Sequence, residues 1–516
     1  MADLIASVGT TSSAPPAPST AAAAAIHAEK LGLNASQVQR FLTEATAYAA
    51  GHGMLVQAPE QRYAHLPYCL FPVPFPKKQF DLGIELSPLF ATLVDRVSAD
   101  PDWLHEQLDS VLAEDEFTRR LVELSKAVQA EGYAHLVPLS HLLGSVVQSA
   151  SLGIHRSDYM LHDDPTNATP AQILQVELNT ISASFACMSS LASNLHRFLF
   201  ERYEDEIPSS YYGAVGDLTS HLPANPALQA LPSALARAHA HYGKPRAVIV
   251  FVIQPNETNS VDQRWLEYTL WETHRVKVLR RSLNEMAKAE LRGPQRELWI
   301  DGAEVAVAYY RSAYTPTDYP SEVEWTGRTT VERSQAIKCP NITYHLAGTK
   351  KVQQVLAQPA QLRRFMTEAE SVVLEKCFTG LYGLEQTSLD LPRIKSLVEV
   401  NPQGYVLKPQ REGGGNNLYG DEVADAIKTW TPAELEAYIL MDRIWPQEQP
   451  AVLVRNGSPV SGETISELGM FSVALFDHGK AVFNEHAGHL LRTKLSSTNE
   501  GGVAAGFAVL SSPFLV

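Results

Sequence analysis

Three consecutive glycines at positions 413–415 follow a short apolar segment, 405–407, that has the composition of a strand. Successive glycines expose backbone N–H groups and permit positive φ angles, which a loop that folds over phosphate groups requires. Lys408 adds positive charge at the base of the segment, and Arg411 and Glu412 adjoin the glycines. We therefore expect a phosphate-covering loop at the end of a strand, with a plain flexible turn as the alternative.

The glycine-rich segment matches neither of the two commonest nucleotide-binding patterns. No Gly-Lys-Ser or Gly-Lys-Thr follows the glycines, as a Walker A loop requires, and the G-x-G-x-x-G spacing of a dinucleotide fold is missing. A nicotinamide oxidoreductase built on the apolar strand near residue 247 is disfavoured, because no glycine-rich turn follows that strand. The sequence also contains no G-x-S-x-G and no H-E-x-x-H, so serine hydrolases and zinc proteases lose their main support.

The charge balance and the cysteines restrict the partners further. The chain has 42 Lys and Arg against 57 Asp and Glu, a formal net charge of −15. A surface of that sign repels phosphate backbones, so nucleic acid is not an expected partner, and an anionic ligand needs a local cluster of basic groups and metal ions. The 4 cysteines form no C-x-x-C pair, which argues against a disulfide framework and against a structural zinc site.

The sequence predicts a cytoplasmic protein without a membrane partner. No stretch approaches the roughly 18 apolar residues of a membrane-spanning helix. The first basic residue is Lys30, so the start of the chain lacks the positive region of an export signal and the arginines of an organelle-targeting helix.

At 516 residues the chain exceeds the size at which single cores divide, so two or three structural units are expected. Residues 1–27 are rich in Ala, Ser and Pro and predict a disordered tail. Residues 28–245 predict an α-rich N-terminal part, residues 246–350 an α/β domain, and residues 351–516 a region of mixed α+β character. The overall fold class is α/β (α+β).

The spacing of hydrophobic residues predicts individual helices and strands within these parts. Apolar residues recur mostly every three or four positions between 102 and 124, which predicts helix, and alternate over 173–179, which predicts a strand. After Pro245 the order is strand, helix, strand and hairpin, over 247–253, 262–273, 277–279, and 298–300 with 305–310 around an Asp301-Gly302 turn. Later strands are expected at 405–408, 438–441, 452–455, 470–476 and 481–484.

Two polar residues on the strand predicted at 173–179 suit a divalent cation. Glu177 and Asn179 offer two hard oxygens on one face, a pattern that fits Mg²⁺ together with phosphate and water ligands. The alternative is that they are plain surface groups. Ser182 and Ser184 follow this strand and either donate hydrogen bonds to a ligand carboxylate or only decorate the end of the strand.

Basic residues adjoin a second loop of small residues near the C-terminus. Arg492 and Lys494 precede the small-residue segment 501–506, which is able to approach a ligand closely and close over it, or is a linker beside a solvated pair. Arg156 with Asp158 predicts either an anion clamp or an ion pair that orients a helix.

His486 and His489 are three residues apart, but they match no recognised metal motif. A structural pair is the favoured interpretation.

Taken together, these segments resemble the eukaryotic glutathione synthetase family of ATP-grasp ligases. The resemblance rests on 174–184, 346–354, 408–420, 465–469, 488–494 and 501–506, and it runs in register from about 151 to 516. It implies an ATP-grasp fold with an α-rich N-terminal part that contributes strands and dimer contacts. It also implies an inserted α/β substrate-binding domain at 246–350 and a C-terminal lid within 351–516.

The resemblance also implies a role for individual residues. It implies magnesium ligands at Glu177, Asn179 and Glu412. It implies ATP contacts at Lys350, Lys408, Glu412, Asn417, Tyr419, Met441, Ile444, Glu467, Lys494 and Glu500, the last standing where the family carries an aspartate. It implies contacts to the peptide substrate at Arg156, Ser182, Ser184, Glu257, Asn259, Gln263, Arg311, Tyr314 and Arg492, and to glycine at Val503 and Ala504. The catalytic group that it implies comprises Arg156, which would stabilise the oxyanion, with Lys494, Gly413 and Gly414.

The implied reaction joins γ-glutamylcysteine to glycine with ATP and about two Mg²⁺ ions per site, through an acylphosphate, in a homodimer. Relatives that use β-alanine carry Leu-Pro in place of the Ala504-Ala505 pair, so glycine is favoured over β-alanine or serine. A catalytically silent nucleotide-binding module is the remaining alternative, although it would be expected to have lost at least one of Glu177, Asn179, Glu412 or Lys494.

Overall fold

The computed structural model describes most of the chain beyond the N-terminal segment. The described residues are 32–58, 60, 62–134, 148–163, 170–207, 212–213, 215–410, 416–498, 502–503 and 506–516. The predicted tail at 1–27 lies outside them.

A mixed sheet of 13 strands forms the centre of the molecule. Its main path runs in the order β17, β3, β20, β19, β18, β5, β12, β11, β10 and β9, with β6 paired to β5, and β7 paired to β11 and β8. The strands are β3 (Tyr68–Cys69), β5 (Ala150–His162), β6 (Gln172–Asn179), β7 (Val248–Val252), β8 (Val278–Arg281), β9 (Glu290–Arg292), β10 (Glu297–Ile300), β11 (Ala303–Tyr310), β12 (Ile337–Cys339), β17 (Gln449–Arg455), β18 (Ser458–Asp477), β19 (Lys480–Leu495) and β20 (Val509–Ser511).

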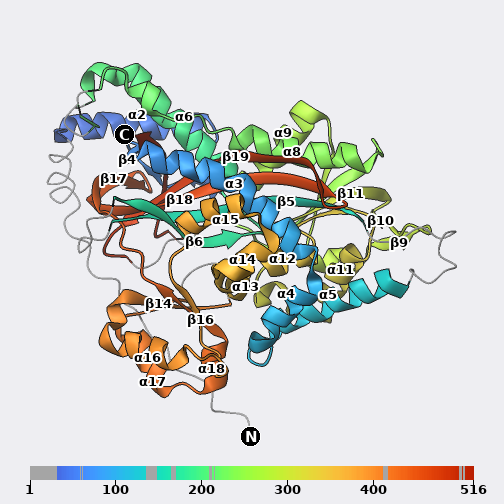
Figure 1. Ribbon diagram of the computed structural model, residues 1–516. Helices are drawn as coiled ribbons and strands as arrows, with labels where there is room; N and C mark the ends of the chain where they lie inside the picture. The colour runs from blue at the N-terminus through green and yellow to red at the C-terminus, as the bar shows by residue number, and fades with distance from the viewer. Residues whose placement is uncertain are drawn as a thin grey trace, which may run out of the picture.

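Helices cover both faces of this sheet (Figure 1). One layer packs on the sheet through a first apolar core and consists of α2 (Ala35–Gly51), α6 (Ala186–Tyr203), α8 (Ala227–Tyr242) and α9 (Ser260–His274). The other layer packs through a second core and consists of α3 (Lys77–Ser98), α4 (Pro101–Leu108), α5 (Glu116–Ala134), α10 (Leu283–Met286), α11 (Glu322–Glu332), α12 (Ile342–Ala347), α13 (Lys350–Leu356), α14 (Pro359–Phe365) and α15 (Glu368–Leu374). Strands covered on both faces are continuously apolar, as all five buried residues of β7 are.

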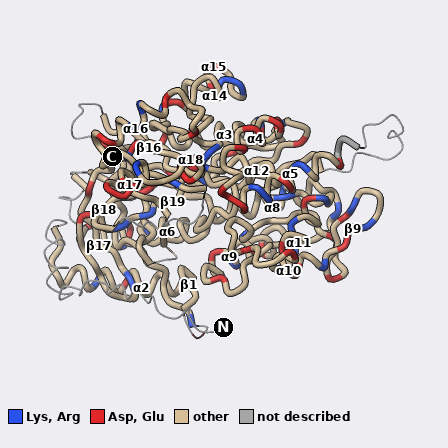
Figure 2. The backbone as a smooth tube through the Cα atoms, turned by 90° about the horizontal axis from the view of Figure 1, so that it is seen from below, with Lys and Arg blue, Asp and Glu red and all other residues tan. Residues whose placement is uncertain are grey.

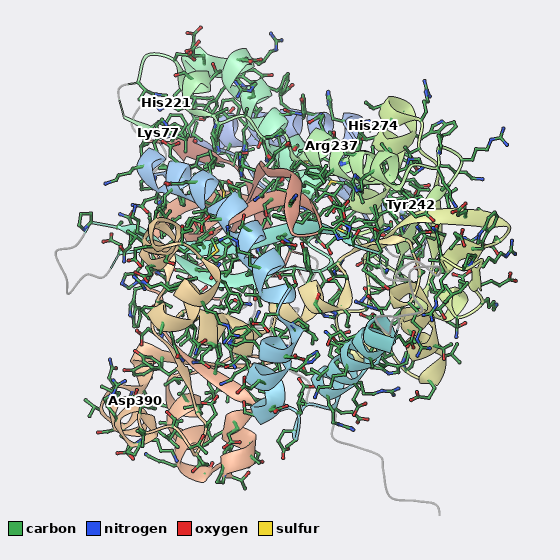
Figure 3. The ribbon with its side chains drawn as sticks, turned by 45° about the vertical axis from the view of Figure 1, so that its right-hand side comes forward. Lys77, His221, Arg237, Tyr242, His274 and Asp390 are labelled. Carbon is green, nitrogen blue, oxygen red and sulfur yellow. The ribbon has the colours of Figure 1, made fainter. Side chains whose placement is uncertain are left out.

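A smaller lobe, residues 381–442, has its own four-stranded sheet and lies at the bottom of Figure 1. Its strands are β13 (Leu381–Gly383), β14 (Tyr405–Pro409), β15 (Leu418–Tyr419) and β16 (Tyr438–Asp442), and its helices are α16 (Leu391–Val400), α17 (Asp421–Thr429) and α18 (Pro432–Glu436). A separate apolar core of ten buried residues holds it together. Figure 3 shows the lobe, marked by Asp390, at the opposite end of the molecule from Arg237 and His274 in the α8 and α9 layer.

Strands near the C-terminus pair with strands near the N-terminus. β20 lies between β19 and β3 in the large sheet. β21 (Pro513–Leu515) pairs in parallel with β4 (Val73–Phe75), and a further hairpin joins β1 (Leu55–Gln57) to β2 (Tyr63–His65).

Several predicted elements are confirmed. The strand predicted at 173–179 is β6, and β7, α9 and β8 follow in the predicted order. The hairpin of β10 and β11 turns at Asp301 and Gly302 with φ of 51° and 75°, the positive values that a tight type I′ turn needs. The predicted division into four parts remains a prediction, and strands from 246–350 continue the large sheet because β12 pairs with β5.

Besides its helices, the N-terminal part contains a long strand that the sequence pattern did not predict. This strand, β5, has 13 residues and lacks alternation because nearly all of them are buried in the centre of the sheet. The predicted helix over 102–124 is also interrupted, since α4 ends at Leu108 and α5 begins at Glu116. The Asp115 carboxylate accepts hydrogen bonds from the backbone N–H of Phe117 and Thr118 and so starts the second helix.

The strands predicted at 470–476 and 481–484 are parts of a much longer hairpin. β18 has 20 residues and β19 has 16. Polar residues interrupt the apolar pattern in the rest of both strands, and three of them, Glu467, Arg492 and Lys494, line the cavity described below.

Candidate active site

A cavity of about 320 Å³ lies between the large sheet and the lobe. The sheet contributes residues from β5, β6, β18 and β19, and the lobe contributes residues from β14, β15 and β16. Among the described residues, six basic side chains line it, namely Arg156, Lys350, Lys408, Arg443, Arg492 and Lys494, against the acidic Glu177, Asp442 and Glu467. Figure 2 shows acidic and basic residues mixed along the backbone elsewhere, so this basic excess is local in a chain of net charge −15. Such a cavity favours an anionic ligand.

Every described residue with an implied nucleotide contact lines this one cavity. They come from a helix, from the lobe and from the large sheet, and they are Lys350, Lys408, Asn417, Tyr419, Met441, Ile444, Glu467 and Lys494. Segments that are far apart in the sequence therefore converge on one site.

Glu177 and Asn179 also line the cavity, at the end of β6. Burial alone would raise the pKa of Glu177, but the nearby charges of Lys350, Lys408 and Arg492 lower it well below its usual value. Lys350 Nζ donates to Glu177 Oε2 at 2.7 Å. Asn179 Nδ2 donates to Asp158 Oδ2 at 3.0 Å and to Glu177 Oε1 at 3.3 Å. Glu177 is thus an ionised carboxylate. The Asn179 amide turns its nitrogen toward two carboxylates, which leaves its oxygen available. These two oxygens fit a hard cation.

Three buried lysines reach the cavity from three different elements. Lys350 is the first residue of α13, Lys494 lies on β19, and Lys408 lies on β14 in the lobe. Lys408 Nζ donates to the backbone oxygen of Val176 at 3.0 Å, which joins the lobe to the strand that carries Glu177.

Arg492 and Glu467 are cross-strand neighbours on β19 and β18 and form an ion pair. Burial raises the pKa of Glu467, the carboxylates of Asp158 and Glu177 raise it further, and Arg492 opposes them. For Arg492, burial would lower the pKa, but Glu467, Asp158 and Glu177 raise it above its usual value, so the guanidinium stays charged.

A second polar cluster contains the residues with an implied peptide contact other than Arg156 and Arg492, which line the cavity itself. Arg311 is buried and donates from Nη1 to the Ala183 backbone oxygen and from Nη2 to Ser184 Oγ, both at 2.7 Å. Ser182 Oγ donates to the Tyr310 backbone oxygen at 3.2 Å. Burial raises the pKa of Tyr314, and Arg311 is among the charges near it.

The strand-to-helix turn before α9 completes this cluster. Glu257 accepts from the Asn259 backbone N–H at 2.6 Å and from Gln263 Nε2 at 2.9 Å. Gln263 Oε1 in turn accepts from Arg280 Nη2 at 2.8 Å.

Ser184 joins the two clusters. Its hydroxyl accepts from Arg311, and its backbone oxygen accepts from Arg156 Nη1 at 3.3 Å. Arg156 also lines the cavity, so one arginine contacts both parts of the site. It forms an ion pair with Asp158 on strand β5, so the alternative in which the pair orients a helix is wrong, and the alternative of an anion clamp remains a prediction.

Five predicted site residues lie outside the described part of the chain: Glu412, Gly413, Gly414, Glu500 and Ala504. Their described neighbours Asn416 and Gly502 both line the cavity. Val503 is described and buried in the first apolar core.

The sequence analysis missed residues that the structure places in or beside the site. Asp442 and Arg443 line the cavity, and Asp262 accepts from the backbone N–H of Phe185 at 2.8 Å at the start of α6. Asp158, treated only as a partner of Arg156, also contacts Arg492 and Asn179. The only sequence signal for Asp158 was its position two residues after Arg156, on a strand that the sequence pattern did not reveal.

His486 and His489 lie where β19 packs against α3. His486 Nδ1 is 3.2 Å from Ser87 Oγ, and the His489 ring meets Phe80 edge to face at 5.1 Å. No group of three or more His, Cys, Asp and Glu residues suited to a metal occurs in the part of the chain that the structure describes. All four cysteines are buried and free.

Among the helices of the described residues, none combines the length and the apolar character that crossing a membrane requires.

Comparison with known proteins identifies relatives over nearly the whole chain. The family described as "Eukaryotic glutathione synthase, ATP binding domain" matches residues 35–515. The chain is 41% identical to "Glutathione synthetase, chloroplastic" of Solanum lycopersicum over 94% of this chain and 85% of that protein. It is 36% identical to "Glutathione synthetase" of Homo sapiens over 93% of this chain and 97% of that protein.

A solved structure shares the fold. The apo form of a glutathione synthetase-like effector from Globodera pallida superimposes with a TM-score of 0.72, covering 94% of this chain and 98% of that one at 22% identity. The sequence matches extend across both the large sheet and the lobe that enclose the cavity, and on this ground the chain belongs to the eukaryotic glutathione synthase family.

Proposed function

We propose that the protein is a glutathione synthetase, which uses ATP to join γ-glutamylcysteine to glycine and releases ADP and phosphate. The observation that carries this proposal is a convergence on one basic cavity. The eight described residues with an implied nucleotide contact line it, and so do Glu177 and Asn179. The second polar cluster, around Arg311, lies against that cavity and supplies a place for the dipeptide.

The chemistry requires activation of a carboxylate, which is a poor acyl donor. The cysteine carboxylate of the dipeptide attacks the γ-phosphoryl group of ATP, and the glycine amine then displaces phosphate from the acylphosphate. Positioning and charge neutralisation supply most of the catalysis of such a transfer. Lys350, Lys408 and Lys494 place three positive charges at the cavity for this purpose.

Arg156 is proposed to stabilise the oxyanion that forms when the amine attacks. It contacts both the cavity and Ser184, so it lies between the nucleotide residues and the dipeptide cluster. Met441 and Ile444, with Tyr419, offer apolar contact to the base of the nucleotide.

Mg²⁺ is proposed to be held by Glu177 and Asn179, with Glu412 outside the described residues. The ionised state of Glu177 and the orientation of the Asn179 amide support this assignment. When bound, the cation neutralises phosphate charge during the transfer.

The function is tested with purified protein, ATP and Mg²⁺, by weighing the products formed from γ-glutamylcysteine with glycine, β-alanine or serine. We expect glutathione as the main product and phosphate release that requires both the dipeptide and glycine. A preference for β-alanine or serine would instead make the protein a homoglutathione-type synthetase. Stabilisation against heat by ATP, with no further response to γ-glutamylcysteine and no product, would indicate a silent nucleotide-binding module.

A homodimer is also proposed, on the basis of the family resemblance, and sedimentation of the purified protein tests it. A cytoplasmic location remains a prediction, and fluorescent tagging in cells tests it, since two of the relatives are named chloroplastic.

A further inference from the structure

Asp158 is a fully buried carboxylate at the centre of the site, with 0% of its side chain exposed. Its Oδ1 accepts from Arg156 Nε at 2.6 Å. Its Oδ2 accepts from Arg156 Nη2 at 2.7 Å, from Asn179 Nδ2 at 3.0 Å and from Arg492 Nη2 at 3.1 Å. One carboxylate on β5 therefore joins residues from three strands of the sheet, namely Arg156 of β5 itself, Asn179 of the neighbouring β6, and Arg492 of β19, which lies beyond β18.

These contacts determine the direction of two guanidinium groups. The two-point contact holds Arg156 by Nε and Nη2, which leaves Nη1 to donate to the Ser184 backbone oxygen. Arg492 is held between Asp158 and Glu467. A planar guanidinium bound at two points has little freedom to rotate, so its remaining N–H groups are oriented before a ligand arrives.

The neighbouring strand leaves room for this arrangement. Gly469 of β18 lies directly opposite Asp158 in the register of the sheet. A Cβ atom at Gly469 would lie 2.8 Å from Asp158 Oδ1 and 2.9 Å from Arg156 Cδ. Its backbone does not adopt a positive φ, so space and not conformation accounts for the glycine.

We infer that Asp158 is a positioning residue that sets the orientation of Arg156 and Arg492 for the peptide substrate, in a space that Gly469 keeps open. Asp158 itself touches no reacting atom and acts through the two arginines. This inference rests on the proposed function, because it assigns the two arginines to the dipeptide and to the acylphosphate.

The first test is Asp158→Asn, which keeps the shape but replaces one acceptor oxygen by a donor that faces other donors. We expect kcat/KM for γ-glutamylcysteine to fall about 100-fold, the loss typical of a misplaced catalytic group. The ATP concentration that gives half of the thermal stabilisation should change less than about twofold, since the lysines and the lobe keep their places. Asp477→Asn, at the far end of β18 and bonded to Ser149, is the matched control and should keep full activity.

A double variant separates positioning from a structural role. If Asp158 acts through Arg156, then Asp158→Asn adds little to the loss already caused by Arg156→Ala. Losses that multiply, or an Asp158→Asn variant with unchanged kcat and KM, would overturn the inference.

The Gly469→Ala variant tests the same inference if Asp158→Asn does not fold. We expect the added methyl group to raise KM for γ-glutamylcysteine at least about tenfold by displacing the Asp158 and Arg156 pair. Gly462→Ala is the control on the same strand, because its Cβ would meet only a flexible Leu495 methyl group. Equal kinetic constants in the two glycine variants would count against the inference.

The wild-type protein distinguishes this inference from the proposed function. Absence of glutathione formation by the wild type would contradict the function itself. Glutathione formation that survives Asp158→Asn and Gly469→Ala unchanged would contradict only the positioning role.

Discussion

The two sides of the cavity differ in how firmly they are held. The sheet side is built from central strands, and its charged residues Arg156 and Asp158 are buried between β18 and β6. The lobe side has a much smaller apolar core, a cluster of ten buried residues among those that the structure describes, and it carries exposed apolar side chains, Leu389 at 99% and Val400 at 83%. A small core opens more readily than a large one. The residues proposed to act on the dipeptide are thus on the rigid side, and many of the residues proposed to contact the nucleotide are on the side that is easier to move.

The largest expected effect is on the rigid side. Lys494→Met should lower kcat by about 100- to 1,000-fold, because it removes one fixed charge that stabilises the transferring group. Lys480→Met, at the exposed start of the same strand β19, should leave kcat unchanged. Steady-state phosphate release measures both, and similar rates in the two variants would refute the assignment of Lys494.

A cavity in the core of the lobe should loosen the lobe alone. Leu407→Ala removes a fully buried side chain from the lobe core and should cost about 2–5 kcal/mol of local stability. We expect faster hydrogen exchange within 381–442 and a higher KM for ATP, with a nearly unchanged melting temperature of the sheet.

Leu468→Ala, in the core under β18, is the counterpart on the sheet side. It should lower the melting temperature of the whole protein. If Leu407→Ala and Leu468→Ala had the same effect on global unfolding, the two sides would be equally firm.

Acid should weaken the sheet side and spare the lobe. Burial lowers the pKa of His155 to about 4 and that of His489 to about 3, whereas residues 381–442 contain no histidine. An unfolded histidine takes up a proton below pH of about 6.5, so each buried one costs up to about 1.4 kcal/mol per pH unit as pH falls from there to its folded pKa.

Melting temperatures between pH 7 and pH 4.5 measure this loss. His489→Met should make the dependence on pH shallower. A slope that is the same in the variant would show that His489 is not the source.

The smallest expected effect is at the surface of the lobe. Val400→Ser should change stability by less than about 0.5 kcal/mol, because the side chain is already in water. Its KM for ATP should match that of the wild type, in contrast to Leu407→Ala, and a large increase would show that Val400 touches a partner or the nucleotide.

Sequence reasoning succeeded where local pattern and structure agree. The strands β6 and β7 and the turn at Asp301 and Gly302 follow from alternation, from continuous apolar character and from residues that tolerate positive φ. It failed for β5, where burial on both faces removed the alternation and where His155, Arg156 and Asp158 made the segment appear polar.

Most of the candidate site came from the family resemblance, since neither spacing nor composition brings Lys350, Lys408 and Lys494 together. Long-range pairing of strands brings them together, and the hydrophobic periodicity of one sequence gives no information about that pairing. The role of Asp158 became visible only from its four contacts across three strands.

The position of β20 between β19 and β3 affects the order in which a ribosome-bound chain can acquire its structure. Tyr68 of β3 leaves the ribosome long before its partner Leu510. The edge of the sheet near β3 must therefore wait, partly unpaired, until the segment that contains β20 has been synthesised. During this interval chaperones have time to act on the unpaired edge.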